Sequence, residues 1–370
     1  MVLSYDVGSL PLHGGMDIKK FSRLAESYSS LRRNLFPGEY DDFTDIVLEG
    51  FVDKLKAGVD VPNYFQPRDM NEMFWRMIYG VEKSSGGYSL TGPLSTTAEN
   101  ARIAEVSAIR ENLGRLSEEA GGKIELKVCV TGPYTLAAQL NNRTNSVYAE
   151  LGEMLSEIVK ANVFSEKHGA VRLVAIDEPA FGVDDSNLDS EKVRKSLLKS
   201  WNGIAREATR LGGVETILHL HNTSDPLFWE SKVNVIESHV GDPIYTTAGT
   251  RRLLEERDKF LKAPIAVTQF DDLIRQKIRS DDPEKIAAEW ERIRRREADP
   301  VSYLEDPDVI KKRLERTVEF FGEERVPYAG PECGLGGHYV GKYPFYDCAI
   351  EYLKRIASVV KDYNASAKTR

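Results

Sequence analysis

The chain has 370 residues, of which 41% are hydrophobic and 29% are charged, and its formal net charge is -8 at pH 7. This apolar content suffices for a large core and exceeds that of a disordered chain. The negative charge argues against a nucleic-acid partner, because proteins of that class bind phosphates with clustered Lys and Arg. We therefore expect a folded protein that does not bind nucleic acid.

No stretch of the sequence approaches the roughly 20 apolar residues that a membrane-spanning helix requires. The first residues also lack the charged and then apolar segments of a secretory signal. The cysteines, Cys129, Cys333 and Cys348, are too few and too widely separated for a disulfide framework. These features predict a cytoplasmic protein without a membrane partner.

Short apolar runs with strand character alternate with longer segments of helical period, a pattern typical of parallel strands joined by helices. The strand-like runs lie at residues 4–10, 59–65, 124–130, 171–176, 215–221, 233–238, 264–269 and 326–331. Eight parallel strands, each followed by a helix, form a (β/α)8 barrel. We therefore predict an α/β fold of the TIM-barrel type.

The segments between these runs repeat apolar residues at the spacing of amphipathic helices. Helices are predicted at residues 42–57, 98–119, 145–168, 191–211, 282–298 and 345–361. Two connections, 11–41 and 66–123, are unusually long and could cover an end of the barrel. The expected organisation is a single catalytic barrel domain over residues 1–363 and a frayed tail at 364–370.

Polar residues gather where the predicted strands end, which is where TIM barrels place their catalytic groups. His219 and His221 are two residues apart on a strand, so their side chains point to the same face. Glu237 ends the next strand and Cys333 follows the last one, so a barrel brings a carboxylate and a thiol near the two imidazoles. This donor set suits Zn²⁺, although cobalt or iron could also accept it.

A pair of histidines at a strand end is more often hydrogen bonded than bound to metal, and a buried cysteine is usually inert. A metal site is favoured here because His, Glu and Cys fall together at three strand ends. Cys333 is also followed by a glycine-rich loop at 334–337, whose backbone can approach a ligand closely. Cys129, within a strand, and Cys348, within a helix, are expected to belong to the core.

Two adjacent carboxylates, Asp177 and Glu178, follow the fourth predicted strand and precede Pro179. A carboxylate at this place could bind the ammonium group of a substrate. It could equally cap the next helix or form a turn. The residue pattern alone leaves both interpretations open.

Seven motifs share their order and approximate spacing with one family of enzymes. They are GSLP at 8–11, AGVDVPNYFQPRDMNEMF at 57–74, TGPYTLA at 131–137, IDEPAF at 176–181, HLHN at 219–222, VIES at 235–238 and PECGLG at 331–336. In these motifs the chain resembles the catalytic barrel of cobalamin-independent methionine synthases, from residue 5 to about residue 340. Those enzymes transfer a methyl group to the thiol of zinc-bound homocysteine, so the resemblance implies a zinc-dependent methyltransferase.

The resemblance also implies roles for individual residues. The family's zinc ligands fall on His219, His221, Glu237 and Cys333. Its substrate-binding residues fall on Ser9, whose loop meets the homocysteine carboxylate, and on Asp177, which meets the ammonium. Glu178 adjoins Asp177, and Gln66 is the nearest candidate for a substrate-binding glutamate of the family.

One departure from the family concerns the metal. The family has a cysteine as its second zinc ligand, whereas His221 stands at that position here. A neutral imidazole in place of a thiolate leaves the site one charge unit more positive, so a bound thiol with an ordinary pKa of about 8.5 ionises more readily. Nucleophilicity falls together with thiol pKa, so such a site favours a reactive methyl donor.

Other departures concern folate. Full-length members carry an additional N-terminal barrel, which this sequence does not contain. The segment AAQLNNRTNS at 137–146 lacks the family's folate-stacking tryptophan, and TQFDDLI at 268–274 lacks its histidine. The pattern resembles the short, folate-independent methionine synthases of archaea and some bacteria. It therefore implies homocysteine as the acceptor and methylcobalamin, free or on a corrinoid protein, as the methyl donor.

Alternatives remain. A related methyltransferase could act on another thiol, such as coenzyme M, and a degenerate homologue could bind a metal or a thiol without catalysis. A metal-independent decarboxylase of the same superfamily is disfavoured, because its substrate carries several carboxylates. The strand ends here carry Asp177, Glu178 and Glu237, which have the wrong charge for such a substrate.

Overall fold

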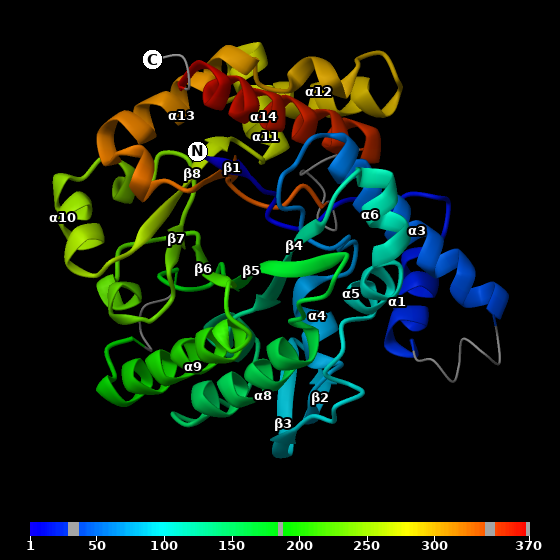
Figure 1. Ribbon diagram of the computed structural model, residues 1–370, viewed down its shortest axis with the longest axis vertical. Coiled ribbons are helices and arrows are strands. Elements are labelled where there is room, and N and C mark those ends of the chain that lie inside the picture. The colour runs from blue at the N-terminus through cyan, green and yellow to red at the C-terminus, as the bar shows by residue number, and fades with distance from the viewer. Residues whose placement is uncertain (29–36, 184–187, 337–344, 368–370) are drawn as a thin grey trace.

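The structure is a computed structural model that describes residues 1–28, 37–183, 188–336 and 345–367. Its central feature is a curled parallel sheet with the strand order β1-β9-β8-β7-β6-β5-β4 (Figure 1). These strands are β1 (Leu3–Ser4), β4 (Ile124–Thr131), β5 (Gly169–Glu178), β6 (Glu215–Leu220), β7 (Val235–Glu237), β8 (Phe260–Ala266) and β9 (Tyr328–Pro331). Helices surround the sheet, as expected for crossover connections between parallel strands.

The two edge strands of this sheet, β1 and β4, are joined through residues 61–66, within and just after the second predicted strand. Isolated parallel bridges connect Tyr5 with Val61 and Asn63 with Lys127. The amide of Lys127 donates to the carbonyl of Pro62 at 2.9 Å. Proline has no amide hydrogen to give to a ladder, which accounts for bridges in place of a continuous strand. This segment takes the eighth position, and the prediction of a TIM-type barrel is confirmed.

Each of the six predicted helices is present with altered boundaries, and the described residues form further helices that were not predicted. They are α1 (Ile18–Glu26), α3 (Pro37–Lys56), α4 (Met70–Trp75), α5 (Ala104–Glu111), α6 (Leu113–Ala120), α7 (Pro133–Ala138), α8 (Val147–Asn162), α9 (Glu191–Thr209), α10 (Ala248–Glu256), α11 (Phe270–Ile278), α12 (Pro283–Arg294), α13 (Pro307–Phe321) and α14 (Tyr346–Ala367). The helix predicted at 98–119 is divided at Asn112 into α5 and α6. None of the described helices is long and apolar enough to cross a membrane.

The predicted frayed tail requires a correction. Residues 364–367 continue α14, and the last part of the tail, 368–370, lies outside the described residues. The side chain of Asn364 accepts a hydrogen bond from the amide of Val2 at 3.0 Å and donates to the carbonyl of Val2 at 2.7 Å. These two bonds tie the end of the helix to the start of the barrel, a long-range contact that local composition does not reveal.

The long connection at 66–123 contains a β-hairpin besides helices α4, α5 and α6. The hairpin, β2 (Tyr79–Ser84) and β3 (Gly87–Ser95), projects from the barrel in Figure 1. Trp75 stacks on Tyr88 with ring centroids 5.0 Å apart. The amide of Tyr88 also donates to the carbonyl of Gln139 at 2.9 Å, so the hairpin is anchored to the loop after α7. The division into one domain over 1–363 remains a prediction.

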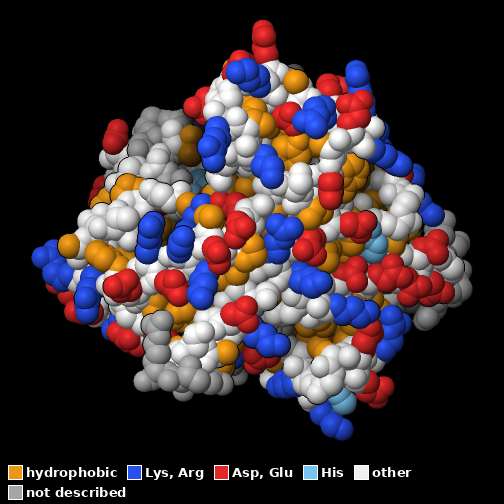
Figure 2. All heavy atoms as spheres, turned by 90° about the horizontal axis from the view of Figure 1, so that it is seen from above, with side chains coloured by type: hydrophobic (Ala, Val, Ile, Leu, Met, Phe, Trp, Pro, Cys, Tyr) orange, Lys and Arg blue, Asp and Glu red, His pale blue; other side chains and the backbone are white. Residues whose placement is uncertain are grey.

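The surface carries charges of both signs. Figure 2 shows basic and acidic side chains interspersed over one face of the molecule. Elsewhere in the molecule, ion pairs form within helices, such as Lys195 with Glu191 at 3.2 Å and Arg292 with Glu289 at 2.8 Å. The net negative charge is therefore not concentrated on the face that Figure 2 presents.

Candidate metal centre

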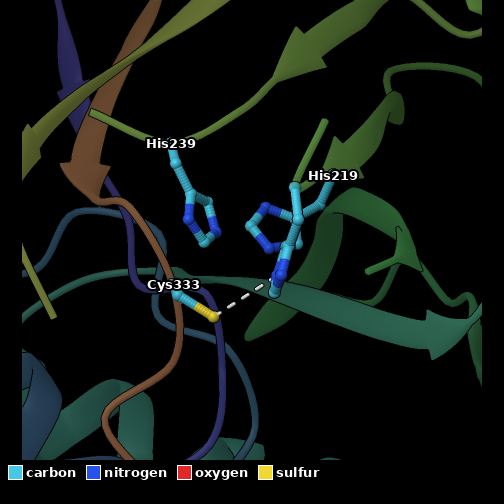
Figure 3. Close-up of side chains that lie close together, drawn as sticks. His219, His239 and Cys333 are labelled. Atoms are coloured by element: carbon cyan, nitrogen blue, oxygen red, sulfur yellow. Dashed lines mark hydrogen bonds between the residues drawn. The ribbon is translucent and has the colours of Figure 1, made fainter. Parts of the chain in front are cut away.

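Three imidazoles and a thiol converge at the carboxyl ends of β6, β7 and β9. One ligand atom from each of His219, His221, His239 and Cys333 lies within 4.8 Å of the other three. Figure 3 shows His219, His239 and Cys333 directed toward a common space. We call these four residues the metal cluster. Three nitrogen donors and one sulfur donor match the N and S ligands that tetrahedral Zn²⁺ accepts.

Buried atoms of the metal cluster lack partners within the protein. Nε2 of His219 and Nε2 of His239 are buried and have no hydrogen-bond partner among the described residues. An unsatisfied buried polar atom costs roughly 1–3 kcal/mol, a cost that a bound ion would offset. Burial also lowers the pKa of His221, which favours the neutral form of the imidazole that binds metals. The residues present thus fit a divalent transition metal.

Strand geometry explains why the cluster forms. His219 is the direct neighbour of Glu237 in the parallel pairing of β6 and β7. His221 and His239 lie two residues farther along, so they share a face with His219 and Glu237 and lie closer to the barrel mouth. The rings of His221 and His239 have centroids 4.1 Å apart. Sγ of Cys333 lies 3.7 Å from Nε2 of His221, which adds the thiol from the end of β9.

Glu237, predicted as a metal ligand, lies outside the metal cluster. Its carboxylate accepts hydrogen bonds from Tyr5 and, at 2.5 Å, from the ammonium of Lys262. Nδ1 of His219 lies 3.2 Å from the same carboxylate. Burial opposes ionisation of Glu237, but Lys262 and His219 nevertheless hold its pKa well below the usual range. Glu237 is thus a charged carboxylate that contacts Tyr5, Lys262 and His219.

The residues beneath the metal cluster form a network that we call the barrel floor, namely Tyr5, Lys127, Lys262 and Glu237. The ammonium groups of Lys127 and Lys262 lie 5.3 Å and 5.2 Å from the centroid of the Tyr5 ring. Lys127 also donates to the carbonyl of Val7 at 2.6 Å. These contacts compensate the burial of two cations, which would otherwise be unfavourable.

Sequence reasoning missed His239 as a cluster member. A signal for it was present, because Glu237 and His239 repeat on β7 the two-residue spacing of His219 and His221 on β6. Either residue of such a pair can face the interior. The spacing therefore identified the correct face of the strand, but it could not identify which side chain reaches the metal cluster.

A cavity of about 250 Å³ opens beside the metal cluster. Its lining includes Ser9, Asp177, His219, His221 and Cys333. Oδ1 of Asp177 is buried and has no hydrogen-bond partner among the described residues. Burial raises the pKa of Asp177, although Lys127 and His219 act in the opposite direction. A buried carboxylate oxygen at the cavity wall is suited to bind a positively charged group.

Ser9 is enclosed by the loop that follows Cys333. Its hydroxyl accepts a hydrogen bond from the amide of Gly336 at 3.2 Å, and its carbonyl accepts one from the amide of Leu335 at 2.8 Å. A Cβ atom on Gly334 would lie 2.1 Å from Oγ of Ser9, and one on Gly336 would lie 2.6 Å from Cβ of Ser9. The glycines therefore permit close contact with Ser9 at the cavity wall. Residue 337 of the predicted glycine-rich loop lies outside the described residues.

Glu178, predicted to bind substrate beside Asp177, points away from the cavity. Its carboxylate accepts hydrogen bonds from the amides of Tyr134 and Thr135 at 3.0 Å and 2.7 Å. It also accepts a bond from the indole of Trp201 at 2.9 Å. Successive residues of a strand face opposite sides, so Asp177 faces the interior and Glu178 faces the helices. We reassign Glu178 to capping helix α7.

Gln66, another predicted substrate-binding residue, lines the cavity but has partners within the protein. Its side-chain oxygen accepts a hydrogen bond from the thiol of Cys129 at 3.1 Å, and its amide nitrogen lies 3.6 Å from the sulfur of Met73. Burial raises the pKa of Cys129 to about 12, as it does for Cys348. Both cysteines are therefore held as thiols in the core, as expected.

The comparisons with known proteins agree with the motifs. A methionine synthase of Saccharolobus solfataricus is 29% identical over 148 residues, which cover 37% of this chain and 42% of that protein. The match thus spans less than half of the curated relative. No family model matches the chain.

Solved structures share the whole fold. A B12-independent methionine synthase from Shewanella sp. W3-18-1, in complex with selenomethionine, has a TM-score of 0.59 at 14% identity and covers 99% of both chains. A methyltransferase from Methanosarcina mazei has a TM-score of 0.50 at 12% identity, covering 97% of this chain and 94% of that one. At these identities the structures establish the fold alone. The chain is thus similar in sequence to a methionine synthase over part of its length, and it shares the barrel fold of the two solved structures.

Proposed function

We propose that the protein is a zinc-dependent methyltransferase that transfers a methyl group to the thiol of homocysteine and so forms methionine. The single observation that carries this proposal concerns the carboxylate of Asp177: it lines the same small cavity as the metal cluster, and its Oδ1 has no hydrogen-bond partner among the described residues. The cavity therefore offers an anionic group for an ammonium and a soft metal site for a thiol. Homocysteine carries both groups on one small molecule.

The acceptor side of the reaction follows from the residues that line the cavity. A bound divalent ion would supply Lewis acidity that lowers the pKa of a thiol substrate. Asp177 would bind the substrate ammonium in a buried place, where pairing of charges is strong. The Ser9 hydroxyl already accepts a bond from Gly336, so its proton is available to the substrate carboxylate. These two contacts would position the thiol beside His221 and Cys333.

The size of the cavity also favours an amino acid. Its volume of about 250 Å³ is below the roughly 300–1,000 Å³ of sites for larger ligands. A thiol without an ammonium group, such as coenzyme M, would leave the carboxylate of Asp177 buried and unpaired, which is costly. Homocysteine is therefore the preferred acceptor.

For the methyl donor, we propose methylcobalamin, free or on a corrinoid protein, in place of folate. The segment that carries a folate-stacking aromatic residue in the resembled family makes contacts here to the end of α4 and to the β2–β3 hairpin. Gln139 accepts a hydrogen bond from the indole of Trp75 at 2.9 Å, and Asn141 donates to Ser84 at 2.7 Å. The side chain of Asn142 accepts a bond from the amide of Leu90 at 3.1 Å. This segment supports a hairpin and offers no aromatic platform for folate.

The test measures methionine formation by zinc-loaded protein given homocysteine with either methylcobalamin or methyl-tetrahydrofolate. We expect methionine from methylcobalamin and none from the folate. Methionine from the folate alone would contradict the proposed donor while supporting the acceptor. If neither donor yields methionine although zinc is bound, the proposed reaction is wrong.

A further inference from the structure

We propose that His239, in place of Glu237, completes the ligand set of the metal, and that Glu237 acts behind it as the group that orients His219. The inference rests on the proposed function in one respect, namely that a metal ion occupies the metal cluster. It does not depend on which thiol is methylated or on the methyl donor.

The first argument is the position of His239. Its ligand atom lies with those of His219, His221 and Cys333 within 4.8 Å. Ligands at the usual Zn–N and Zn–S distances of about 2.0–2.3 Å are roughly 3.3–3.8 Å apart in a tetrahedron. The cluster therefore needs only a modest contraction around an ion. Nε2 of His239 is buried and has no other partner among the described residues, so it is available as a ligand.

The second argument is that Glu237 is committed elsewhere. Lys262 is fully buried, and Glu237 is its only carboxylate partner among the described residues. Moving Glu237 to a metal would weaken this pair, and breaking a buried ion pair is strongly unfavourable because it leaves an uncompensated buried charge. Tyr5 would lose its carboxylate acceptor as well. His239 can bind the ion without any of these losses.

The third argument is that the backbone around His239 is fixed on both sides. The amide of Ser238 donates to the hydroxyl of Tyr245 at 2.8 Å, and the amide of Val240 donates to the carboxylate of Glu332 at 3.0 Å. Glu332 directly precedes Cys333, so one carboxylate holds the loops of two cluster members in register. Such support is typical of ligands that are positioned before the metal binds.

The proposed arrangement assigns Glu237 a positioning role. Its carboxylate lies 3.2 Å from Nδ1 of His219, at ion-pair distance but without hydrogen-bond geometry, so Nε2 is the ring nitrogen left for the metal cluster. Carboxylates that hold metal-bound histidines in this way fix the tautomer of the ring and raise its basicity. With three neutral imidazoles and one thiolate, a divalent ion retains a formal charge of +1. That charge favours binding of the substrate thiol as a thiolate.

The experiment is X-ray absorption at the zinc edge of the full-length protein, where outer-shell scattering counts the imidazoles bound to zinc. We expect three imidazoles and one sulfur in the unaltered protein. His239→Ala should reduce the count to two imidazoles. Glu237→Gln should keep three, with zinc affinity lowered by roughly 10–100-fold because an orienting group is lost. His168→Ala, which removes an imidazole at the opposite end of β5, is the matched control and should change neither quantity.

Chelator competition measures the zinc affinity of each variant, and thermal unfolding shows whether each variant is folded. If His239→Ala does not fold, the number of imidazoles bound to zinc in the unaltered protein still tests the inference. Two zinc-bound imidazoles in the unaltered protein would overturn the inference. So would a number of imidazoles that changes in Glu237→Gln but not in His239→Ala. Either result would concern the ligand set alone. The proposed reaction is tested separately, by methionine formation.

Discussion

The metal cluster and the barrel floor are adjacent, equally polar and largely buried, yet they differ in one respect. In the barrel floor, the carboxylate of Glu237 accepts hydrogen bonds from Tyr5 and Lys262, so these polar groups have partners within the protein. In the region of the metal cluster, nitrogens of His219 and His239 and an oxygen of Asp177 have no hydrogen-bond partner among the described residues. Satisfied buried groups stabilise a fold, whereas unsatisfied ones retain the capacity to bind a ligand. The comparison thus separates buried polar groups that pair with one another from buried polar groups that are left available to a ligand.

The largest expected effect tests the barrel floor. Lys262→Met removes the ammonium that pairs with the buried carboxylate of Glu237, so we expect the free energy of unfolding to fall by about 3–5 kcal/mol. Denaturant unfolding measures this loss, and the double variant Lys262→Met/Glu237→Gln should recover part of it. Lys199→Met is the matched control, because Lys199 is exposed and pairs with Glu153 at the surface; it should cost less than about 1 kcal/mol. Equal losses in the two lysine variants would contradict the role of the barrel floor.

The next prediction concerns Glu178, which is buried but bound to helix α7. Burial raises its pKa to about 7 from 4.5, against the effect of its hydrogen-bond donors. Because the folded-state pKa is raised, the stabilisation is fully present below the unfolded pKa and is lost as the pH rises from 4.5 to about 7. The loss amounts to about 3 kcal/mol at 1.36 kcal/mol for each unit of pKa shift.

Thermal unfolding at pH 5 and pH 7.5 tests this assignment. Glu178→Gln should reduce the difference between the two midpoints, since the titrating group is removed. Glu153→Gln, at an exposed ion pair, should leave the difference as it is in the unaltered protein. An unchanged difference in Glu178→Gln would show that another group is responsible.

The smallest expected effect sharpens the description of the cavity. Asp177→Asn removes the negative charge but keeps the shape, so we expect kcat/KM for homocysteine to fall by roughly 30–100-fold, or about 2–3 kcal/mol. Zinc content should be retained, and the unfolding midpoint should be unchanged or higher, because the burial of an unpaired carboxylate is relieved. Asp272→Asn, at a half-exposed carboxylate in the first turn of α11 that pairs with Arg275, serves as the control. Homocysteine use that is unaffected by Asp177→Asn would argue for another acceptor.

Much of the barrel could be predicted from the chain. The alternation of apolar runs and helical segments located its parallel strands, including the bridged segment at 61–66 between β1 and β4. The break at Asn112 was not predicted, and the helical tail at 364–367 could not be predicted, because a long-range contact stabilises it. The bond pair between Asn364 and Val2 joins opposite ends of the sequence, and no local pattern reports it.

In the candidate site, too, some features could be predicted from the sequence and others depend on long-range contacts. The sequence by itself determined that His219, His221 and Cys333 lie at strand ends and that Glu237 shares a face with His239, because residues two apart on a strand face the same side. Only the tertiary structure shows that His239 lies in the metal cluster and that Glu237 pairs with Lys262. This arrangement depends on Lys262 and Tyr5, which come from other strands and satisfy the carboxylate. Strand periodicity specifies the direction of a side chain, whereas its partners, and therefore its function, depend on residues that only folding brings together.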